Sequence, residues 1–256
     1  MTTKTKVEML DGKPLAGKTA LITGGGKRLG RAIALALADA GADVAITFLH
    51  SEREAVATVH ALRKRGVGAF ALHCNVTEES SVKAAIPAAI RELGRLDILV
   101  NNAGNYETVE FGEITVAQWD AMFASNTRGP FLVTQTALAE LTRRKGRVIN
   151  LGSLGGMVPW ASHAHYCASK AALHMLTKVM AKALAPEVAV NCVAPGMIDL
   201  ADGSGDAEFF VRMAKQTPMQ RNGTAADIAA AVRFFAGSPH FITGQVMSVD
   251  GGLGLG

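Results

Sequence analysis

Short apolar runs alternate along the chain with longer stretches in which apolar residues recur at helical spacing. The short runs are bounded by Gly, Asn or Pro, and several are apolar on both alternating faces, which is typical of parallel strands covered by helices. We expect strands at Thr19–Thr23, Val44–Phe48, Gly68–His73, Leu96–Asn101, Arg147–Leu151, Val188–Val193 and Val246–Val249. Helices are expected at about 28–40, 52–65, 79–93, 115–143, 163–185 and 224–237.

The order strand, helix, strand predicts a doubly wound α/β fold of the Rossmann type, with about seven parallel strands and helices on both faces. No linker or further repeat divides the chain, so residues 1–256 are expected to form a single domain. Residues 1–15 are expected to be a flexible N-terminal extension. Residues 199–215, which begin with a polar, Gly-rich segment, are expected to be a substrate lid, with an ordinary surface loop as the alternative.

Composition and charge exclude several classes of protein. With 49% apolar and 19% charged residues the chain is not a disordered one. The net charge of +4 is scattered, and only 5% of residues are aromatic, so we expect no nucleic-acid partner. No apolar stretch approaches the roughly 20 residues that span a bilayer, and no membrane partner is expected. Cys74, Cys167 and Cys192 form no CxxC pair and are expected to be reduced thiols of a cytoplasmic protein.

A Gly-rich turn follows the first expected strand and leads into a helix: Thr23-Gly24-Gly25-Gly26-Lys27-Arg28-Leu29-Gly30. Glycines there let a pyrophosphate approach backbone N–H groups at a helix N-terminus, where side chains would obstruct it. A Gly cluster alone is weak evidence, but this position, on the first strand-to-helix turn, favours dinucleotide binding.

Tyr166 and Lys170 are four residues apart in an expected helix, so they share a face. An ammonium beside a phenol stabilises the phenolate and brings the pKa of the phenol towards values at which it exchanges protons efficiently. An isolated pair of this kind would be a buried tyrosine and a solvated lysine. Ser153, thirteen residues before Tyr166, makes that interpretation a poor one when it is taken with the motifs below.

These motifs occur in order along the chain: Asn75-Val76, Asn101-Asn102-Ala103-Gly104, Asn126, Ser153, Tyr166 with Lys170, and Pro195-Gly196. With them the chain resembles the short-chain dehydrogenase/reductase family from about Lys18 to Gly252. It is most similar in type to 3-oxoacyl-(acyl carrier protein) reductases. The turn Thr-Gly-x-x-x-Arg-Leu-Gly is similar to that of pteridine reductases, although those enzymes typically carry Asp at the place of Ser153.

The resemblance implies a role for each catalytic residue. Tyr166 would be the general acid that protonates a carbonyl oxygen as hydride reaches the carbon. Ser153 would polarise that oxygen. Lys170 would lower the pKa of the tyrosine and hold the nicotinamide ribose, and Asn126 would anchor a water that relays protons to Lys170.

The expected cofactor is NADP(H). Enzymes that prefer NAD carry Asp or Glu at the end of the second strand, where this chain has Phe48. Lys27 and Arg28 in the Gly-rich turn, with His50 and Ser51 after the second strand, offer hydrogen-bond donors that suit a 2′-phosphate. Glu52 and Glu54 could bind ribose hydroxyls instead, but they are expected to face solvent in the first turn of a helix. The expected cofactor-binding residues are Gly24, Lys27, Arg28, Leu29, Gly30, His50, Ser51, Asn75, Val76, Asn102, Ala103, Gly104, Tyr166, Lys170, Pro195, Gly196 and Ile198.

Three positions depart from the family pattern. Arg28 stands where most members have the second Gly of the turn, and Asn75 replaces a usual Asp. Leu200 replaces a Thr that binds the carboxamide, so weaker positioning of that group is expected. The expected substrate-facing residues are Asn105, Tyr106, Leu154, Trp160, His163 and Met197. No metal is expected, because His163 and His165 have no third ligand placed with them.

The favoured function is NADPH-dependent reduction of a small carbonyl substrate to an alcohol, with the substrate carried on an acyl carrier protein as one possibility. Arg144 matches a carrier-contacting arginine of such reductases, but Glu187 replaces another basic position. The alternatives are a pteridine or dihydrofolate-type reductase and, from a different class, a non-catalytic NADP-binding sensor or scaffold. The resemblance also implies a homotetramer joined through the helices of Asn126 and Tyr166 and the C-terminal strand.

Overall fold

The computed structural model describes residues 13–200 and 206–255. Its main sheet consists of β1 (Thr19–Ile22), β2 (Asp43–Phe48), β3 (Ala69–His73), β4 (Ile98–Asn101), β5 (Arg147–Leu151), β6 (Ala189–Pro195) and β9 (Val246–Val249). The spatial order is β3-β2-β1-β4-β5-β6-β9, and every neighbouring pair is parallel. The predicted doubly wound α/β fold is therefore confirmed.

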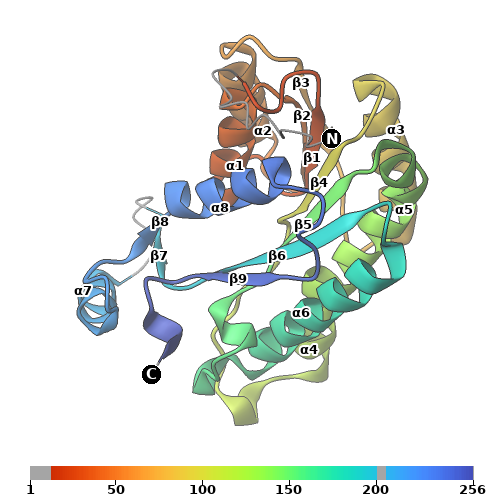
Figure 1. Ribbon diagram of the computed structural model, residues 1–256. Coiled ribbons are helices and arrows are strands. Elements are labelled where there is room, and N and C mark those ends of the chain that lie inside the picture. The colour runs from red at the N-terminus through yellow and green to blue at the C-terminus, as the bar shows by residue number, and fades with distance from the viewer. Residues whose placement is uncertain (1–12, 201–205, 256) are drawn as a thin grey trace, which may run out of the picture.

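Helices cover both faces of this sheet (Figure 1). One face carries α1 (Arg28–Asp39), α2 (Glu52–Arg63) and α8 (Ala225–Gly237), and the other carries α3 (Glu79–Leu93), α5 (Gly129–Arg144) and α6 (Ala164–Leu184). Successive strand residues serve opposite faces: Leu21 packs in the second layer and Ile22 in the first, both fully buried. This is why the strands are apolar at successive positions.

The expected helix over 115–143 is wrong as a single element. It consists of α4 (Val116–Phe123), a π-helical turn η2 (Ala124–Arg128) and α5. A capping box between Thr115 and Gln118 starts α4. The wide turn places Asn126 at the junction, where it is fully buried. Such turns are frequent at functional sites.

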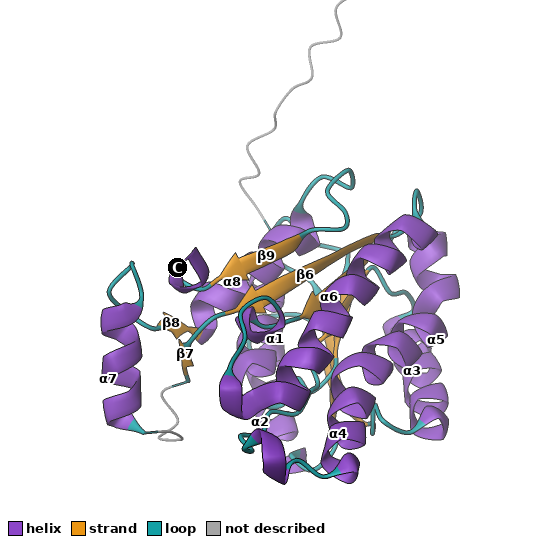
Figure 2. Cartoon of the chain, turned by 90° about the horizontal axis from the view of Figure 1, so that it is seen from below, coloured by secondary structure: helices purple, strands orange, loops and turns teal. Residues whose placement is uncertain are grey.

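A small two-stranded sheet, β7 (Ile198–Asp199) with β8 (Gly223–Thr224), was not expected, because two-residue strands leave no periodic pattern. Together with α7 (Ala207–Gln216) it stands away from the main sheet (Figure 2). The expected lid therefore includes β7 residue Asp199 and most of α7, while residues 201–205 lie outside the described residues.

The folded unit begins within the expected N-terminal extension. Leu15 is buried in the layer of α1 and α8, and its N–H donates to the carbonyl of Ala40 at 2.8 Å. Residues 1–12 of that extension lie outside the described residues. Among the described helices, none is long and apolar enough to cross a bilayer.

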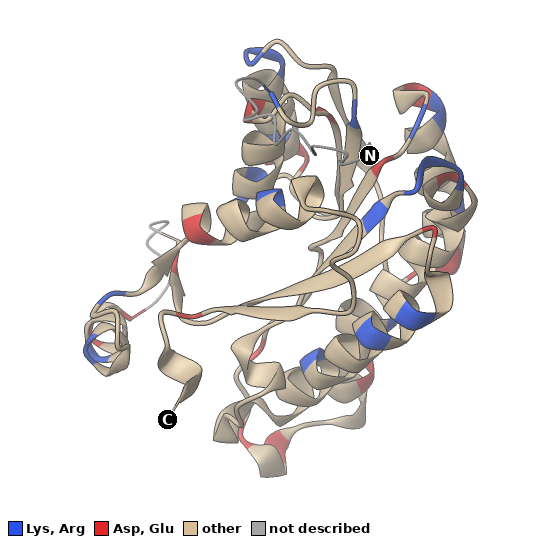
Figure 3. Cartoon of the chain, in the orientation of Figure 1, with Lys and Arg blue, Asp and Glu red and all other residues tan. Residues whose placement is uncertain are grey.

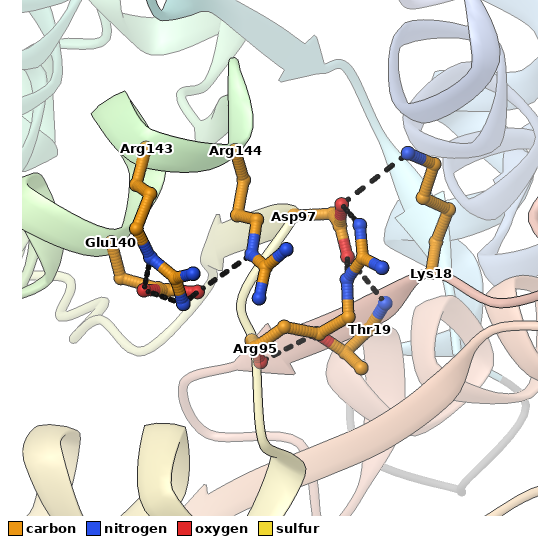
Figure 4. A network of polar contacts seen from close by, with 7 residues as sticks. All are labelled: Lys18, Thr19, Arg95, Asp97, Glu140, Arg143 and Arg144. Atoms are coloured by element: carbon orange, nitrogen blue, oxygen red, sulfur yellow. Dashed lines mark hydrogen bonds and ion pairs between the residues drawn. The ribbon is translucent and has the colours of Figure 1, made fainter.

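A polar network closes the amino end of β4 (Figure 4). The buried carboxylate of Asp97 accepts hydrogen bonds from the N–H of Thr19 at 3.0 Å and from the Arg95 guanidinium at 2.6 and 2.7 Å. Burial opposes the charge of Asp97, but these bonds and the charges of Arg95 and Lys18 outweigh it and lower the pKa of the carboxyl. Elsewhere, Lys and Arg are spread over several helices and loops rather than along one stripe (Figure 3).

Candidate active site

A cleft of about 650 Å³ opens at the carboxyl ends of β1, β2, β3 and β4. Ligands bind at this edge of open parallel sheets, and the volume suits a small organic molecule. Residues expected to bind the cofactor line it: Gly24, Lys27, Arg28, Leu29, Gly30, His50, Ser51, Asn75, Val76, Asn102, Ala103 and Gly104. The others lie outside its lining: Tyr166 and Lys170 in α6, Pro195 at the end of β6, Gly196 just after it and Ile198 in β7.

The Gly-rich turn forms a cradle that side chains would fill. Gly24 has φ +64°, and a Cβ at Gly30 would lie 2.2 Å from the Gly24 carbonyl oxygen. The Asn102 amide donates to the carbonyls of Thr23 and Gly24 at 2.9 and 3.0 Å, which fastens the turn to the loop after β4. This turn, at the start of α1, fits the pyrophosphate of a dinucleotide.

Basic and polar groups gather where the ribose beside the adenine would lie. Phe48 ends β2 without a carboxylate, and Lys27, Arg28 and His50 are exposed in the cleft. Arg28 has φ +51°, a conformation that costs an L-residue about 1–2 kcal/mol. Glu52 and Glu54 are exposed in the first turn of α2 and outside the cleft lining.

Other residues of the cleft escaped the sequence analysis. Arg128, from the π-helical turn, lines the cleft and donates to the Thr77 carbonyl at 3.2 Å. The Thr47 hydroxyl oxygen accepts a hydrogen bond from the Gly24 N–H at 3.3 Å. Neither belongs to a motif, so the sequence carried no signal for them. Asn75 lines the cleft, and its side-chain oxygen accepts hydrogen bonds from the Thr77 N–H and hydroxyl.

Ser153, Tyr166 and Lys170 come together beside the carboxyl end of β5. All three are buried, with 4%, 9% and 6% of their surface exposed. The Ser153 hydroxyl accepts the Gly155 N–H at 3.1 Å and lies beside the Tyr166 phenol, whose charged form it favours. The Lys170 ammonium lies 5.9 Å from the centre of the Tyr166 ring.

Burial dominates the electrostatics of this group. It raises the pKa of Tyr166 to about 12, partly offset by the hydrogen bond from Ser153. It lowers the pKa of Lys170 to about 8. Lys170 is not among the groups that shift the pKa of Tyr166 in the chain itself, where desolvation of the phenolate dominates, so the expected lowering of that pKa by Lys170 stays a prediction. At neutral pH Tyr166 is a neutral phenol, the form that can donate a proton.

Asn126 joins three parts of the site. Its side chain accepts the Asn105 N–H at 2.8 Å and donates to the Asn105 carbonyl at 2.9 Å and to the Ser169 hydroxyl at 3.0 Å. A Cβ at Gly104 would lie 2.7 Å from the Asn126 side-chain oxygen. Asn126 therefore ties the loop after β4 to α6, and its role toward a water stays a prediction.

Aromatic residues surround Tyr166. The Tyr106 ring meets it edge-on at 5.0 Å, and the Trp160 ring is parallel to it at 6.3 Å. His163 stacks on Tyr106 at 5.1 Å and bonds its hydroxyl at 2.7 Å. Of the other expected substrate-facing residues, Asn105 lines the cleft, Met197 is half-buried and Leu154 is buried.

His165 is fully buried and lies 3.4 Å from Glu107. Within residues 13–200 and 206–255, no three His, Cys, Asp or Glu side chains are arranged to hold a metal ion.

Comparison with known proteins identifies the family. A family model described as enoyl-(acyl carrier protein) reductase matches residues 26–254. The 3-oxoacyl-[acyl-carrier-protein] reductase FabG of Staphylococcus aureus (strain Mu50 / ATCC 700699) is 39% identical over 241 residues, which are 92% of this chain and 98% of that protein.

Solved structures agree. A short-chain dehydrogenase/reductase from Serratia marcescens BCRC 10948 has a TM-score of 0.89 at 35% identity, covering 94% of this chain and 99% of that one. A gluconate 5-dehydrogenase from Burkholderia cenocepacia J2315, in complex with NADP and tartrate, has a TM-score of 0.89 at 33% identity, covering 96% and 98%. This chain therefore belongs to the short-chain dehydrogenase/reductase family and is an oxidoreductase.

Proposed function

We propose that this protein reduces the carbonyl group of a small ketone to an alcohol, using NADPH. The observation that carries the proposal is the meeting of the Ser153 hydroxyl, the Tyr166 phenol and the Lys170 ammonium in a chain whose Gly-rich turn lines a cleft. NADPH, when bound, supplies hydride to the carbonyl carbon. The protein's own groups then have to receive the charge that develops on the carbonyl oxygen.

Tyr166 supplies the proton. Its phenol is neutral at pH 7, because burial holds its pKa at about 12. The Ser153 hydroxyl accepts the Gly155 N–H at 3.1 Å and, once a substrate is bound, donates its own proton to the carbonyl oxygen. The Lys170 ammonium stabilises the phenolate that remains after the transfer. A sensor or scaffold that only bound the cofactor would need none of these contacts.

The cleft favours NADPH over NADH. Lys27, Arg28 and His50 present donors where a 2′-phosphate would lie, and among the described residues no carboxylate lines the cleft beside Phe48 to bind the ribose hydroxyls. The relative from B. cenocepacia was solved with NADP. Residues at the nicotinamide end would be Tyr166, Lys170 and the backbone of Ile198, with Leu200 on the cleft wall.

The proposed substrate is a 3-oxoacyl thioester or a related ketone, as the name of the S. aureus relative suggests. Pteridine reduction is the second candidate, because Arg28 occupies a strained position in a turn like that of pteridine reductases. Ser153 favours the ketone, since it donates a neutral hydrogen bond and cannot protonate a ring nitrogen as an Asp could.

Delivery on an acyl carrier protein needs its own test. Arg144 is paired with Glu140 at 2.9 Å, at the end of α5 that adjoins the amino end of β5. The 16 residues of α5 span about 24 Å, so Arg144 lies far from Tyr166 of the same chain. If a carrier docks there, Arg144→Ala raises KM for the carrier-bound thioester and leaves a free thioester unaffected. Equal effects on both would exclude this docking site.

We further propose a homotetramer in the cytoplasm. Phe131 lines a groove between α4, α5 and α6. Exposed apolar side chains lie on these helices, on α8 and toward the C-terminus: Val116, Trp119, Phe131, Met175, Val179, Phe234, Phe241 and Leu255. Such patches are typical of subunit contacts. Light scattering after gel filtration tests the tetramer, and a monomer would overturn it.

The cytoplasmic location is proposed from the cysteines. All three are free thiols, as expected for a reducing compartment.

A substrate panel tests the proposed function. The purified protein is assayed with NADPH and with NADH against an acetoacetyl thioester, simple ketones and dihydrobiopterin. We expect turnover of the thioester or a ketone with NADPH. Turnover of dihydrobiopterin alone would replace the ketone proposal, and no turnover of any substrate would contradict both.

A further inference from the structure

His174 lies on the buried face of α6, one helical turn beyond Lys170 and two beyond Tyr166. It belongs to no motif, and the proposed chemistry does not use it. Its Nε2 atom lies 3.3 Å from the backbone nitrogen of Ser153 and accepts that N–H. The imidazole is therefore bonded to the residue that would polarise the substrate carbonyl.

The N–H of Ser153 needs this acceptor because the sheet ends there. Gly152 makes the last bond of the ladder, donating its N–H to the Val193 carbonyl at 2.8 Å. The chain then turns into the short helix Leu154–Gly156, and Ser153 is buried away from water. A buried N–H without a hydrogen bond would be unfavourable, and the imidazole of His174 accepts this N–H where no neighbouring strand does.

The backbone encloses the imidazole closely on both sides of Ser153. A Cβ at Gly152 would lie 2.2 Å from Nε2 of His174, and one at Gly156 would lie 2.6 Å from its Cε1. With the Gly155 N–H donating to the Ser153 hydroxyl, both the main chain and the hydroxyl of Ser153 are held. Such contacts restrict the orientation of the Ser153 hydroxyl, and catalysis depends on holding such a group close to its productive geometry.

The imidazole also has the protonation state that this contact needs. Burial, with the nearby charges of Lys170 and Lys178, lowers the pKa of His174 to about 4. Nε2 is therefore free to accept at neutral pH, and the ring proton resides on Nδ1.

We propose that His174 is a positioning residue that aims the Ser153 hydroxyl at the substrate oxygen by accepting the Ser153 N–H. This inference rests on the proposed carbonyl reduction for its kinetic consequence. The contact itself is a statement about the fold and can be measured without turnover.

Three variants test the proposal kinetically. His174→Leu removes the acceptor, whereas His174→Gln can place an oxygen near the position of Nε2. We expect His174→Leu to lower kcat about tenfold or more with the affinity for NADPH within twofold, and His174→Gln to keep at least a third of wild-type kcat. In a Ser153→Ala background, His174→Leu should cost less than twofold, because the residue through which it acts is gone.

Equal losses in the Leu and Gln variants, or a full loss in the Ser153→Ala background, would overturn the proposal. His174→Met replaces the Leu variant if that variant melts far below wild type. Amide hydrogen exchange is the readout that needs no activity: protection of the Ser153 N–H should fall in His174→Leu and persist in His174→Gln. Unchanged protection in both would overturn the inference, whereas an inactive wild type would overturn only the proposed function.

Discussion

The Lys170 ammonium lies 5.9 Å from the centre of the Tyr166 ring, yet its hydrogen bond goes to the carbonyl of Leu151 at 2.8 Å. Leu151 is the last residue of β5, so the sheet itself fixes the ammonium. The proposed effect of Lys170 on Tyr166 therefore has to act through charge rather than through a direct bond. A charge acting in this way has an effect only while the lysine is protonated.

A pH dependence follows from the lowered pKa of Lys170. Because that pKa is about 8, the ammonium is charged below pH 8 and loses its charge above it. We expect kcat/KM for carbonyl reduction to fall as pH rises through about 8. In Lys170→Met the rate should be low at every pH, with no decline near 8, whereas Lys170→Arg should remain active without that decline. A decline that persists in the Met variant would assign it to another group.

Tyr166→Phe removes the proposed proton donor and keeps the ring that packs against Tyr106 and Trp160. We expect kcat to fall by about 10²-fold or more, the usual contribution of a positioned acid. The affinity for NADPH, measured by fluorescence titration, should stay within about threefold. A residual rate above about a tenth of wild type would mean that another group gives the proton.

Coenzyme preference should depend on the turn residue Arg28. We expect kcat/KM for NADPH to exceed that for NADH by about tenfold or more, or ~1.4 kcal/mol. Arg28→Ala and His50→Ala should reduce the ratio of the two kcat/KM values, chiefly by raising KM for NADPH. Glycine adopts φ +51° more readily than arginine, so Arg28→Gly should lower the preference for NADPH without loss of stability. Glu52→Gln is the control: a loss of NADH use there would make Glu52 a ribose ligand.

Ser153 separates the two substrate classes. If a ketone is reduced, Ser153→Ala should lower kcat by about 10²–10³-fold, or ~2.7–4 kcal/mol, as loss of an oxyanion donor does. Ser153→Asp should shift the ratio of kcat/KM for dihydrobiopterin over an acetoacetyl thioester towards the pterin. Wild-type turnover of the pterin with none of the thioester would reverse the order of the two candidates.

Asp97 should contribute to stability in a pH-dependent way. Because its pKa is lower in the folded chain, its contribution is complete above the ordinary carboxyl pKa of about 3.9 and is lost as pH falls through the folded-state value. Asp97→Asn should destabilise by about 1.5–3 kcal/mol at pH 7, measured by urea unfolding. The difference from wild type should shrink below about pH 4. Glu79→Gln, in the exposed pair with Lys83, should change little.

Much of the fold could be predicted because the central strands are buried on both faces. Leu21 and Ile22 are neighbours, and each enters a different layer of the core, so the apolar run marks the strand directly. The turns after these strands carry the cofactor motifs, which places the cleft as well. The π-helical turn could not be predicted, because its residues Ala124–Arg128 carry no apolar pattern and only their hydrogen-bond reach distinguishes it from an α-helix.

Properties of the site that depend on burial and on the path of the chain could not be predicted from the sequence. The pKa of Tyr166 is raised because the phenol is buried, and no motif states how deeply it lies. Arg128 enters the cleft only because the helix is interrupted just before α5. His174 could have been assigned to the face of Lys170 by its spacing of four residues, but its acceptor role requires the exit path of β5.

The wide turn at Asn126 also preserves the angular phase of the helix that follows. Each residue of an α-helix turns the chain by about 100°, and a π-helical turn holds one residue more than an α-helical one for nearly the same rotation. The extra residue lets Asn126 face inward to Asn105 while the apolar side of α5, with Val133 and Leu141, still faces the sheet. Removing one residue from Ala124–Arg128 would therefore restore a regular α-helical turn, leave α5 on its layer and withdraw Asn126 from the site. The helix can thus gain or lose this contact of the site without repacking against the sheet.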